Sequence, residues 1–325
     1  MQLSVVIPAH DEQDNVPELV RRLRGVLDSL SAEWEIVLVD DGSTDATWEC
    51  MVEAAEGGGA VRALRLSRNF GHQAALSAGL LAASGERVVT MDSDLQHPPE
   101  AIPDLLAKAD EGYDVVYGIR VRREGEGWFK ARASTAFYRL LNRLARLDLP
   151  EGAADFRVMS RRVVDAVVGM PERHRFLRGI TRWVGFRQAV VAYESPARSA
   201  GQSKYTVRHM ARFALHAIVS FSAVPLRIAS LLGFVASALG ALYLAYVVAI
   251  RLFTDTAVAG WTSVVVAVLI LGGAQLLCLG IIGQYLGQMY DEVKGRPLFL
   301  VAEDTAGSAG IGSNPDKTAR VAVSG

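Results

Sequence analysis

Asp92 and Asp94, separated by a single serine, stand at the end of an apolar run. The segment 88–94 reads VVTMDSD, and residues two apart in extended backbone point to the same side of the chain. Two neighbouring carboxylates repel each other unless they share a cation or one of them holds a proton. Their oxygens suit Mg²⁺ or Mn²⁺, which take further ligands from water and from a substrate diphosphate. The pattern predicts a divalent-metal site, against the alternative of two solvated loop acids.

The elements around this pair alternate between strand-like and helix-like runs. We expect strands at 3–8, 35–40, 61–67, 86–91 and 113–120. We expect helices at 15–30, 46–56, 71–85, 134–147 and 154–167. This rhythm predicts an α/β fold with a mostly parallel sheet covered by helices on both faces. Four polar loops, HDEQDN, DGSTD, SRNFG and DSDLQ, directly follow strands, and such sheets bind ligands at the carboxyl ends of their strands.

Two long uncharged segments lie in the C-terminal third of the chain. Residues 228–250 and 261–290 hold 23 and 30 residues without a charged side chain. As helices rising about 1.5 Å per residue, both are long enough to cross ~30 Å of hydrocarbon. The short link between them contains Arg251 and Asp255. We expect a transmembrane helical hairpin, the alternative being two buried core helices.

The resulting plan has five parts. They are a cytoplasmic domain at 1–200, an amphipathic juxtamembrane helix at 201–225, transmembrane helices at 226–252 and 260–290, and a flexible tail at 301–325. Basic residues flank the two spans, namely Arg208, Arg212, Arg227, Lys294 and Arg296. The positive-inside tendency therefore places the N-terminal domain and both termini in the cytoplasm, at the inner cell membrane. We expect the helix at 201–225 to lie on anionic membrane lipids, the alternative being a surface helix packed on the domain.

Net charge, the N-terminal residues and the two cysteines argue against three further features. The formal net charge of the 325 residues is −1, which gives no support for a nucleic-acid partner. The opening residues, MQLSVVIPAH, become polar too early for a signal peptide. Cys50 lies in the N-terminal part and Cys278 in the second apolar segment, so we expect no disulfide between them.

Six motifs, in this order, carry a resemblance to a known family. They are VVIPAHDEQDNV, VDDGSTDAT, LSRNFGHQAALSAGL, MDSDLQHPPE, ADFRVMSRR and AGQSKYT. The series resembles that of polyprenyl-phosphate glycosyltransferases, which are dolichyl-phosphate-mannose-synthase-like enzymes of the inverting type. The branch most resembled is that of the bactoprenol glucosyltransferases, which have two C-terminal spans. The resemblance implies a GT-A fold, a Rossmann-like nucleotide-sugar domain, over the first 200 residues.

The resemblance also implies roles for individual residues. Those implied to bind the nucleotide sugar are Pro8, Ala9, Glu12, Asp41, Asp92 and Ser93. Those implied to bind the metal, Mg²⁺ or Mn²⁺, are Asp92, Asp94 and Gln96. Those implied to bind phosphates are Arg120, Arg132, Arg198 and Lys204. Asp155 matches the acid that acts as base or positions the acceptor, so the implied catalytic residues are Asp155 and Asp94.

Several of these residues have a structural alternative. Asp41 could belong to a turn, and we assign Asp45 to the N-terminal cap of the helix at 46–56. Asp155 could cap the arginine-rich helix after it or pair with an arginine, while Arg198 and Lys204 could contact the leaflet. His72 and His97 receive no functional role. Trp183, in GITRWVG, resembles part of the QxxRW motif of processive synthases, but the glutamine is absent.

The expected activity is transfer of one sugar, with inversion, from a nucleotide sugar to polyprenyl (undecaprenyl) phosphate. UDP-glucose is the donor that the branch favours, ahead of UDP-GalNAc, UDP-GlcNAc, a modified pentose and GDP-mannose. The alternatives are a processive synthase, a transferase acting on a neutral lipid, and a non-enzymatic, nucleotide-sensing membrane protein. A homo-oligomer packing through the spans would suit the family.

Overall fold

The computed structural model of the chain describes residues 2–30, 32–58, 60–121, 153–173, 175–194, 224–253 and 260–307. The chain divides into two compact units. The first unit comprises residues 1–143, 147–206 and 295–325, and the second comprises 144–146 and 207–294. All strands of the described part belong to the first unit.

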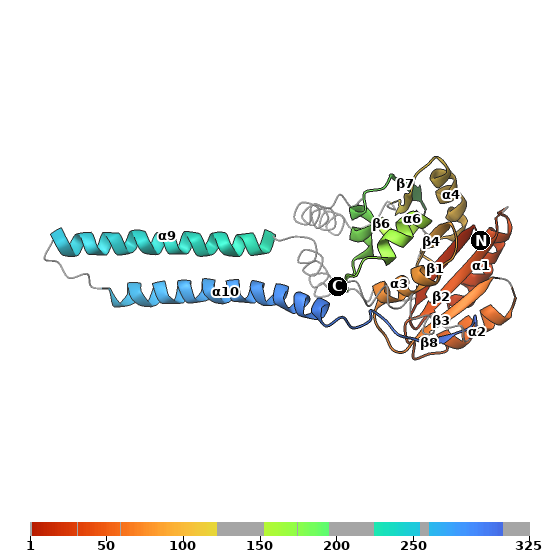
Figure 1. Ribbon diagram of the computed structural model, residues 1–325, viewed down its shortest axis with the longest axis horizontal. Helices are drawn as coiled ribbons and strands as arrows, with labels where there is room; N and C mark the ends of the chain where they lie inside the picture. The colour runs from red at the N-terminus through yellow and green to blue at the C-terminus, as the bar shows by residue number, and fades with distance from the viewer. Residues whose placement is uncertain are drawn as a thin grey trace. The chain divides into compact units, whose positions relative to one another are not determined.

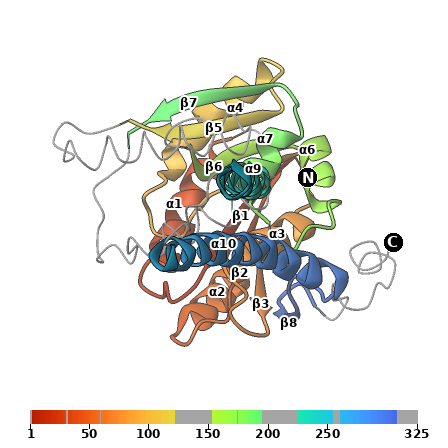
Figure 2. The ribbon, with the colours of Figure 1, turned by 90° about the vertical axis from the view of Figure 1, so that its left-hand side faces the viewer.

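The first unit is built on one mixed sheet of eight strands (Figures 1 and 2). The strands are β1 (Leu3–Ala9), β2 (Trp34–Asp40), β3 (Val61–Leu66), β4 (Arg87–Thr90), β5 (Val115–Arg120), β6 (Ala153–Ser160), β7 (Gln188–Tyr193) and β8 (Val301–Asp304). Their order in the sheet is β7-β5-β6-β4-β1-β2-β3-β8. The central strands β4, β1, β2 and β3 are parallel, and so are β5 and β7. Their carboxyl ends therefore bring the loops after β1, β2, β3 and β4 to one edge, as expected.

Helices cover both faces of this sheet. Those of the first unit are α1 (Val16–Asp28), α2 (Thr47–Glu56), α3 (His72–Ala82), the 3₁₀ turn η1 (Pro99–Ala101), α4 (Ile102–Asp110), α6 (Arg161–Val168) and α7 (Leu177–Trp183). Alternate side chains of β1 face opposite ways: Val5 and Ile7 join the buried core that α1 contributes to, whereas Val6 faces α3. A Cβ at Gly79 of α3 would collide with the Val6 side chain, so glycine permits the close packing of this helix.

The helix expected at 154–167 is only half correct. Residues Ala153–Ser160 form β6, which pairs antiparallel with β4 and β5, and the helix begins at Arg161. The buried run from Asp155 to Met159 explains the difference, because both faces of this strand are covered. Arg157 is 1% exposed, and only its tertiary partners make that burial possible. The expected helices at 134–147 and 201–225 lie in, or almost wholly in, the part outside the described residues.

The flexible tail expected from residue 301 is wrong for its first four residues. Val301–Asp304 form β8, which pairs antiparallel with the edge strand β3. Arg62 of β3 donates to both carboxylate oxygens of Asp304, at 3.0 and 2.6 Å, and Arg65 pairs with Glu303 at 3.1 Å. The Ser67 amide also donates to the Leu300 carbonyl, at 2.9 Å. β8 therefore covers what would otherwise be an open sheet edge.

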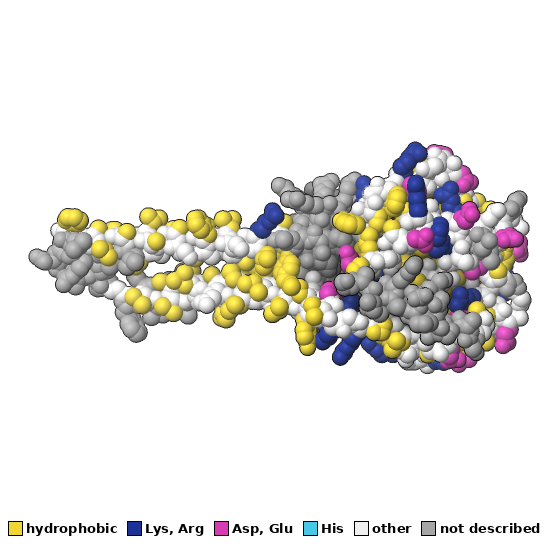
Figure 3. Space-filling model, in the orientation of Figure 1, with side chains coloured by type: hydrophobic (Ala, Val, Ile, Leu, Met, Phe, Trp, Pro, Cys, Tyr) yellow, Lys and Arg dark blue, Asp and Glu magenta, His cyan; other side chains and the backbone are white. Residues whose placement is uncertain are grey.

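The second unit contains two long apolar helices, α9 (Val224–Phe253) and α10 (Trp261–Val293). Their segments Val224–Ile250 and Ile270–Val293 are long and apolar enough to cross a membrane. Large apolar side chains on both helices are exposed, as the yellow surface of Figure 3 shows. Where they meet, Ala229 is buried and the Cys278 thiol lies 3.4 Å from its carbonyl. Both cysteines are free, as expected.

Candidate active site

The loops after β1 and β2 are joined by hydrogen bonds. The Asp11 carboxylate accepts the Thr44 amide at 2.8 Å, and the Asp11 amide donates to Ser43 Oγ at 3.0 Å. The Glu12 amide donates to Thr47 Oγ1 at 2.8 Å. Asp45 accepts the Thr47 amide at 3.0 Å at the start of α2, although Ala46, and not Asp45 as expected, holds the N-cap position. These bonds give the expected nucleotide-binding edge a defined shape around the buried end of β1, where Pro8 and Ala9 lie.

Asp41 holds the loop that leads into α3. Its two carboxylate oxygens accept the amides of Phe70 and Gly71, at 2.8 and 2.9 Å. Gly71 has a φ of +98°, a conformation that side-chain-bearing residues rarely adopt. Burial raises the pKa of Asp41 above its usual value despite these two amide bonds. Neither a turn nor a helix cap was the correct structural alternative for this residue, and its contact with the nucleoside stays a prediction.

The Asp92–Asp94 loop begins directly after β4. Asp94 accepts the Gln96 amide at 3.1 Å and the Gln96 side-chain nitrogen at 2.8 Å. Arg120, at the end of β5, lies with its guanidinium 3.5 Å from the side-chain oxygen Oε1 of Gln96. Ser93 is buried, and Leu95 has a φ of +59°, which is strained for a leucine. The structure thus brings together Asp94, Gln96 and Arg120, which the sequence assigned to metal and phosphate binding.

Asp92 is oriented by a histidine that received no role from the sequence. The Asp92 amide donates to His97 Nδ1 at 3.0 Å, and the Asp92 Oδ2 atom lies 3.6 Å from the same nitrogen. His97 is buried and stacks on Phe156 of β6, with ring centroids 5.2 Å apart. The Asp92 Oδ1 atom is itself buried and accepts no hydrogen bond from the described residues. A buried carboxylate oxygen of this kind fits a cation ligand.

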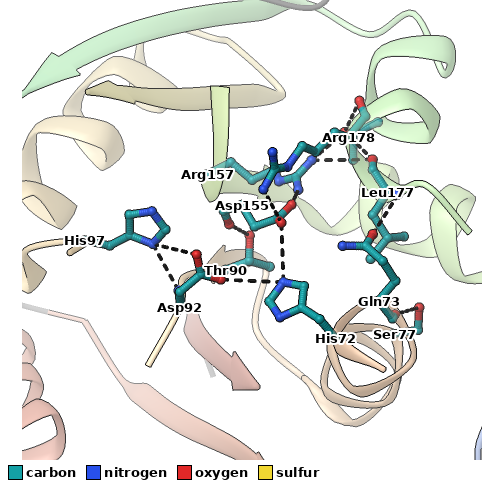
Figure 4. Close-up of polar contacts among 11 residues, drawn as sticks. His72, Gln73, Ser77, Thr90, Asp92, His97, Asp155, Arg157, Leu177 and Arg178 are labelled. Carbon is teal, nitrogen blue, oxygen red and sulfur yellow. Dashed lines mark hydrogen bonds and ion pairs between the residues drawn. The ribbon is translucent and has the colours of Figure 1, made fainter. Parts of the chain in front are cut away.

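Asp155 lies across from this loop and is surrounded by positive charge (Figure 4). Arg157 pairs with its Oδ1 atom, and Arg178 of α7 donates to its Oδ2 atom at 2.8 Å. The side chain is 3% exposed, and burial alone would raise its pKa. The Arg178 and Arg157 guanidiniums and the His72 imidazole instead hold the pKa of Asp155 well below its usual value. The alternative of an arginine pair is therefore correct for Asp155, and that of a helix cap is wrong, because the residue lies inside β6.

His72 lies between the two acidic positions. Its Nε2 atom is 3.3 Å from Asp155 Oδ2 and 3.5 Å from Asp92 Oδ1 (Figure 4). Burial opposes its protonation, yet the adjacent Asp155 and Asp92 carboxylates raise the pKa of the imidazole above its usual value. One ligand atom from each of these three residues falls within 4.8 Å of the others. Since two guanidiniums already occupy Asp155, the Asp92–Asp94 side of the group suits a cation better.

Sequence reasoning missed His72, Arg157 and Arg178. A usable signal existed for His72, because it opens a helix directly after one of the four polar strand-end loops. Arg157 and Arg178 carry no local signal, since their partner Asp155 is reached only through the tertiary fold. The predicted phosphate ligands Arg132, Arg198 and Lys204 lie outside the described residues.

Comparison with known proteins places this chain in a family. Residues 4–168 match glycosyl transferase family 2. A glycosyltransferase of Synechocystis sp. is 42% identical over 303 residues, covering 93% of this chain and 95% of that protein. The bactoprenol glucosyl transferase of Shigella phage SfII is 37% identical over 308 residues, covering 95% of this chain and all of that protein.

Among solved structures, glucosyl-3-phosphoglycerate synthase from Mycobacterium tuberculosis, in complex with Mn²⁺, UDP-glucose and phosphoglyceric acid, matches with a TM-score of 0.47 at 22% identity. The match covers 67% of this chain and 77% of that one.

The fold and the family match define a glycosyltransferase of the GT-A type. The chain belongs to glycosyl transferase family 2, in the branch that the six motifs predicted.

Proposed function

We propose that the protein transfers one sugar, with inversion, from a nucleotide sugar to a polyprenyl phosphate at the inner leaflet of the cell membrane. UDP-glucose is the proposed donor and undecaprenyl phosphate the proposed acceptor. The observation that carries the proposal is the pairing of an open acidic loop, Asp92–Asp94, with the buried, charge-compensated Asp155. The activity named for the Shigella phage SfII relative, a bactoprenol glucosyl transferase at 37% identity, supports it.

Asp92 and Asp94 would hold Mg²⁺ or Mn²⁺, with Gln96 beside them. The donor set supports this assignment, because Asp92 Oδ1 is buried without a hydrogen-bond partner among the described residues. When bound, a divalent cation supplies positive charge that stabilises the leaving diphosphate. Arg120 stands at the same loop and would add to that stabilisation, together with Arg132, Arg198 and Lys204.

The charge state of Asp155 fits a phosphate acceptor. A phosphate monoester has a second pKa of about 6, so it is largely dianionic at neutral pH. One of its oxygens attacks the anomeric carbon from the face opposite the nucleotide, and the bond from that carbon to the diphosphate oxygen breaks. The nucleoside diphosphate leaves with the electron pair, and no proton has to be removed. A carboxylate whose pKa lies well below its usual value is a poor base, so Asp155 positions or electrostatically tunes the acceptor.

The two apolar helices would hold this site at the surface where the lipid phosphate lies. Confinement to the same membrane raises the effective concentration of the acceptor without any added affinity. We propose that both helices span the membrane, that the catalytic domain and both termini are cytoplasmic, and that the chain forms a homo-oligomer. Fusion of a reporter to either terminus tests the topology.

The deciding experiment is a donor screen with the purified full chain in detergent. Undecaprenyl phosphate, Mn²⁺ or Mg²⁺, and one nucleotide sugar at a time are combined, and the lipid product is identified by mass. We expect one donor, UDP-glucose, to give a metal-dependent product that Asp94→Asn does not form. Asp165→Asn on the surface of α6 is the matched control and should retain activity. Product on a neutral lipid, but not on the phosphate, would instead favour the alternative acceptor class.

A further inference from the structure

His72 contacts the donor side and the acceptor side of the site with a single atom. Nε2 lies 3.5 Å from Asp92 Oδ1, on the loop after β4, and 3.3 Å from Asp155 Oδ2, on β6 (Figure 4). The contact with Asp155 is the shorter one, and Asp92 Oδ1 accepts no hydrogen bond from the described residues, so the imidazole reaches Asp92 through an ion-pair contact. The distance between Asp92 and Asp155 therefore depends on where this imidazole stands.

The backbone around His72 is fixed on both sides. Before it, Asp41 accepts the amides of Phe70 and Gly71. After it, Gln73 Oε1 accepts the amide of Leu177, the first residue of α7, at 2.9 Å. The same helix α7 carries Arg178, which pairs with Asp155. The neighbours of His72 are thus held by bonds to two other segments, the end of β2 and the start of α7, which an incidental surface histidine would lack.

Neither packing nor charge compensation explains this placement. The His72 side chain is 41% exposed, so it is not part of the core. Asp155 is paired with two guanidiniums besides the imidazole, so His72 is only one of three groups that compensate its charge. What the contact with His72 adds is a link from Asp155 to Asp92.

We propose that His72 is a positioning residue that fixes the spacing between Asp92 and Asp155, and with it the spacing between the donor diphosphate and the acceptor phosphate. The proposal rests on the proposed function, because it assigns the donor to Asp92 and the acceptor to Asp155. A displacement of about 1 Å between reacting groups can cost on the order of 10²-fold in rate. The effect should therefore appear in kcat and leave donor affinity almost unchanged.

The test compares His72→Ala, His72→Gln, Asp155→Asn and the double variant His72→Ala/Asp155→Asn in the full chain. We expect His72→Ala to lower kcat by roughly 10- to 100-fold, as loss of an orienting partner does elsewhere. The dissociation constant for UDP with Mn²⁺, measured by calorimetry without acceptor, should change less than about threefold. His72→Gln keeps one N–H donor and should recover part of kcat, and the double variant should be little worse than Asp155→Asn.

Other results would overturn the proposal. An unchanged kcat in His72→Ala would make the contact incidental. A loss of UDP and Mn²⁺ binding as large as the loss of kcat would make His72 a donor or metal ligand. Losses that multiply in the double variant would show that His72 and Asp155 act independently. Thermal unfolding of each variant identifies a folding defect, and His72→Gln then serves as the test in place of His72→Ala.

A second measurement needs no acceptor. The NMR signal of the His72 imidazole should shift on Asp155→Asn, on Asp92→Asn and on addition of UDP with Mg²⁺. If the signal did not shift on one of the two substitutions, the proposed link between Asp92 and Asp155 through His72 would be wrong, even if the enzyme were active. Failure of the wild type to make any lipid-linked product would overturn the proposed function instead, while this signal would still decide the role of His72.

Discussion

The two acidic positions of the site differ in how their negative charge is compensated. Asp155 is 3% exposed, lies on a strand inside the sheet and is paired with Arg157 and Arg178. Asp92 is 31% exposed, lies on a loop, and has no arginine partner among the described residues. A carboxylate that the protein has already neutralised is fixed in place, whereas one without such a partner remains available to a cation.

The backbone at Asp155 is also held more firmly than the backbone of the Asp92–Asp94 loop. Asp155 lies on β6 two residues before Arg157, which pairs with Thr90 of β4 and Tyr117 of β5, and Thr90 Oγ1 donates to the Asp155 carbonyl at 2.5 Å. The Asp92–Asp94 loop contains Leu95 in the left-handed region, a conformation that must be maintained by the surrounding contacts. We infer that the fold holds Asp155 rigidly in place and leaves the Asp92–Asp94 loop open to a ligand.

The largest expected effect comes from removing the compensated acid. Asp155→Ala leaves the 1% exposed Arg157 as an uncompensated buried charge, which typically costs ~3–5 kcal/mol in the free energy of unfolding. Sugar transfer should be lost as well. Thermal or denaturant unfolding in detergent measures the stability. A variant as stable as the wild type would mean that Arg157 finds another partner, and the contrast between the two acids would fail.

For Asp94, in contrast to Asp155, we expect a loss of activity without a loss of stability. Asp94→Asn keeps the size of the side chain and removes no arginine pair, so the free energy of unfolding should change by less than about 0.5 kcal/mol. Transfer should fall by about 10²-fold or more, because charge stabilisation at the diphosphate is lost. Steady-state kinetics at several Mn²⁺ concentrations measures the loss. A destabilisation as large as that of Asp155→Ala would place Asp94 among the structural acids.

Acid should remove the contribution of Asp155 to the stability of the fold. The pKa of Asp155 is depressed in the folded state, so its contribution to stability is complete above the unfolded value of about 3.9. That contribution is lost as the pH falls through the lower folded pKa. The unfolding temperature of the wild type should therefore fall more steeply below about pH 4 than that of Asp155→Asn. If the unfolding temperatures of the two proteins fell in parallel with pH, Asp155 would not be a group whose protonation destabilises the fold.

Much of this arrangement could be predicted from local patterns. Apolar runs ending in polar loops identified the parallel strands, and uncharged segments identified α9 and α10. The Asp92–Asp94 pair was visible because both acids follow one strand. Each of these signals is contained in a short stretch of sequence, so no knowledge of tertiary contacts was needed.

What could not be predicted depends on distant partners. ADFRVMSRR contains three arginines and resembles a surface helix, yet Arg157 is buried, with Asp155, Thr181 and the Leu177 carbonyl as partners of its two terminal nitrogens. The contact of His72 with Asp155 forms only in the tertiary fold, where α3 and β6 lie close together. β8 is four residues long and carries two acids, and it forms a strand because Arg62 and Arg65 of β3 receive those acids.

The smallest predicted effect separates charge compensation from function. Asp304 resembles Asp155 in chemistry, since its side chain is 7% exposed, Arg62 donates to both its oxygens, and this pairing outweighs burial to lower its pKa. It lies on β8, however, and contacts no residue of the acidic site among the described residues. Asp304→Ala should therefore cost on the order of 1 kcal/mol in stability, because Arg62 remains partly solvated, and should leave kcat within about twofold.

Glu303→Gln, in the exposed pair with Arg65, is the matched control and should have a smaller effect on stability. Unfolding and steady-state kinetics are measured on both variants. If Asp304→Ala lowered kcat as strongly as loss of His72, arginine-paired acids anywhere in the sheet would influence turnover. The salt bridges of Asp155 would then be enough to explain its effect on turnover. The contact with His72 would not be needed for that explanation.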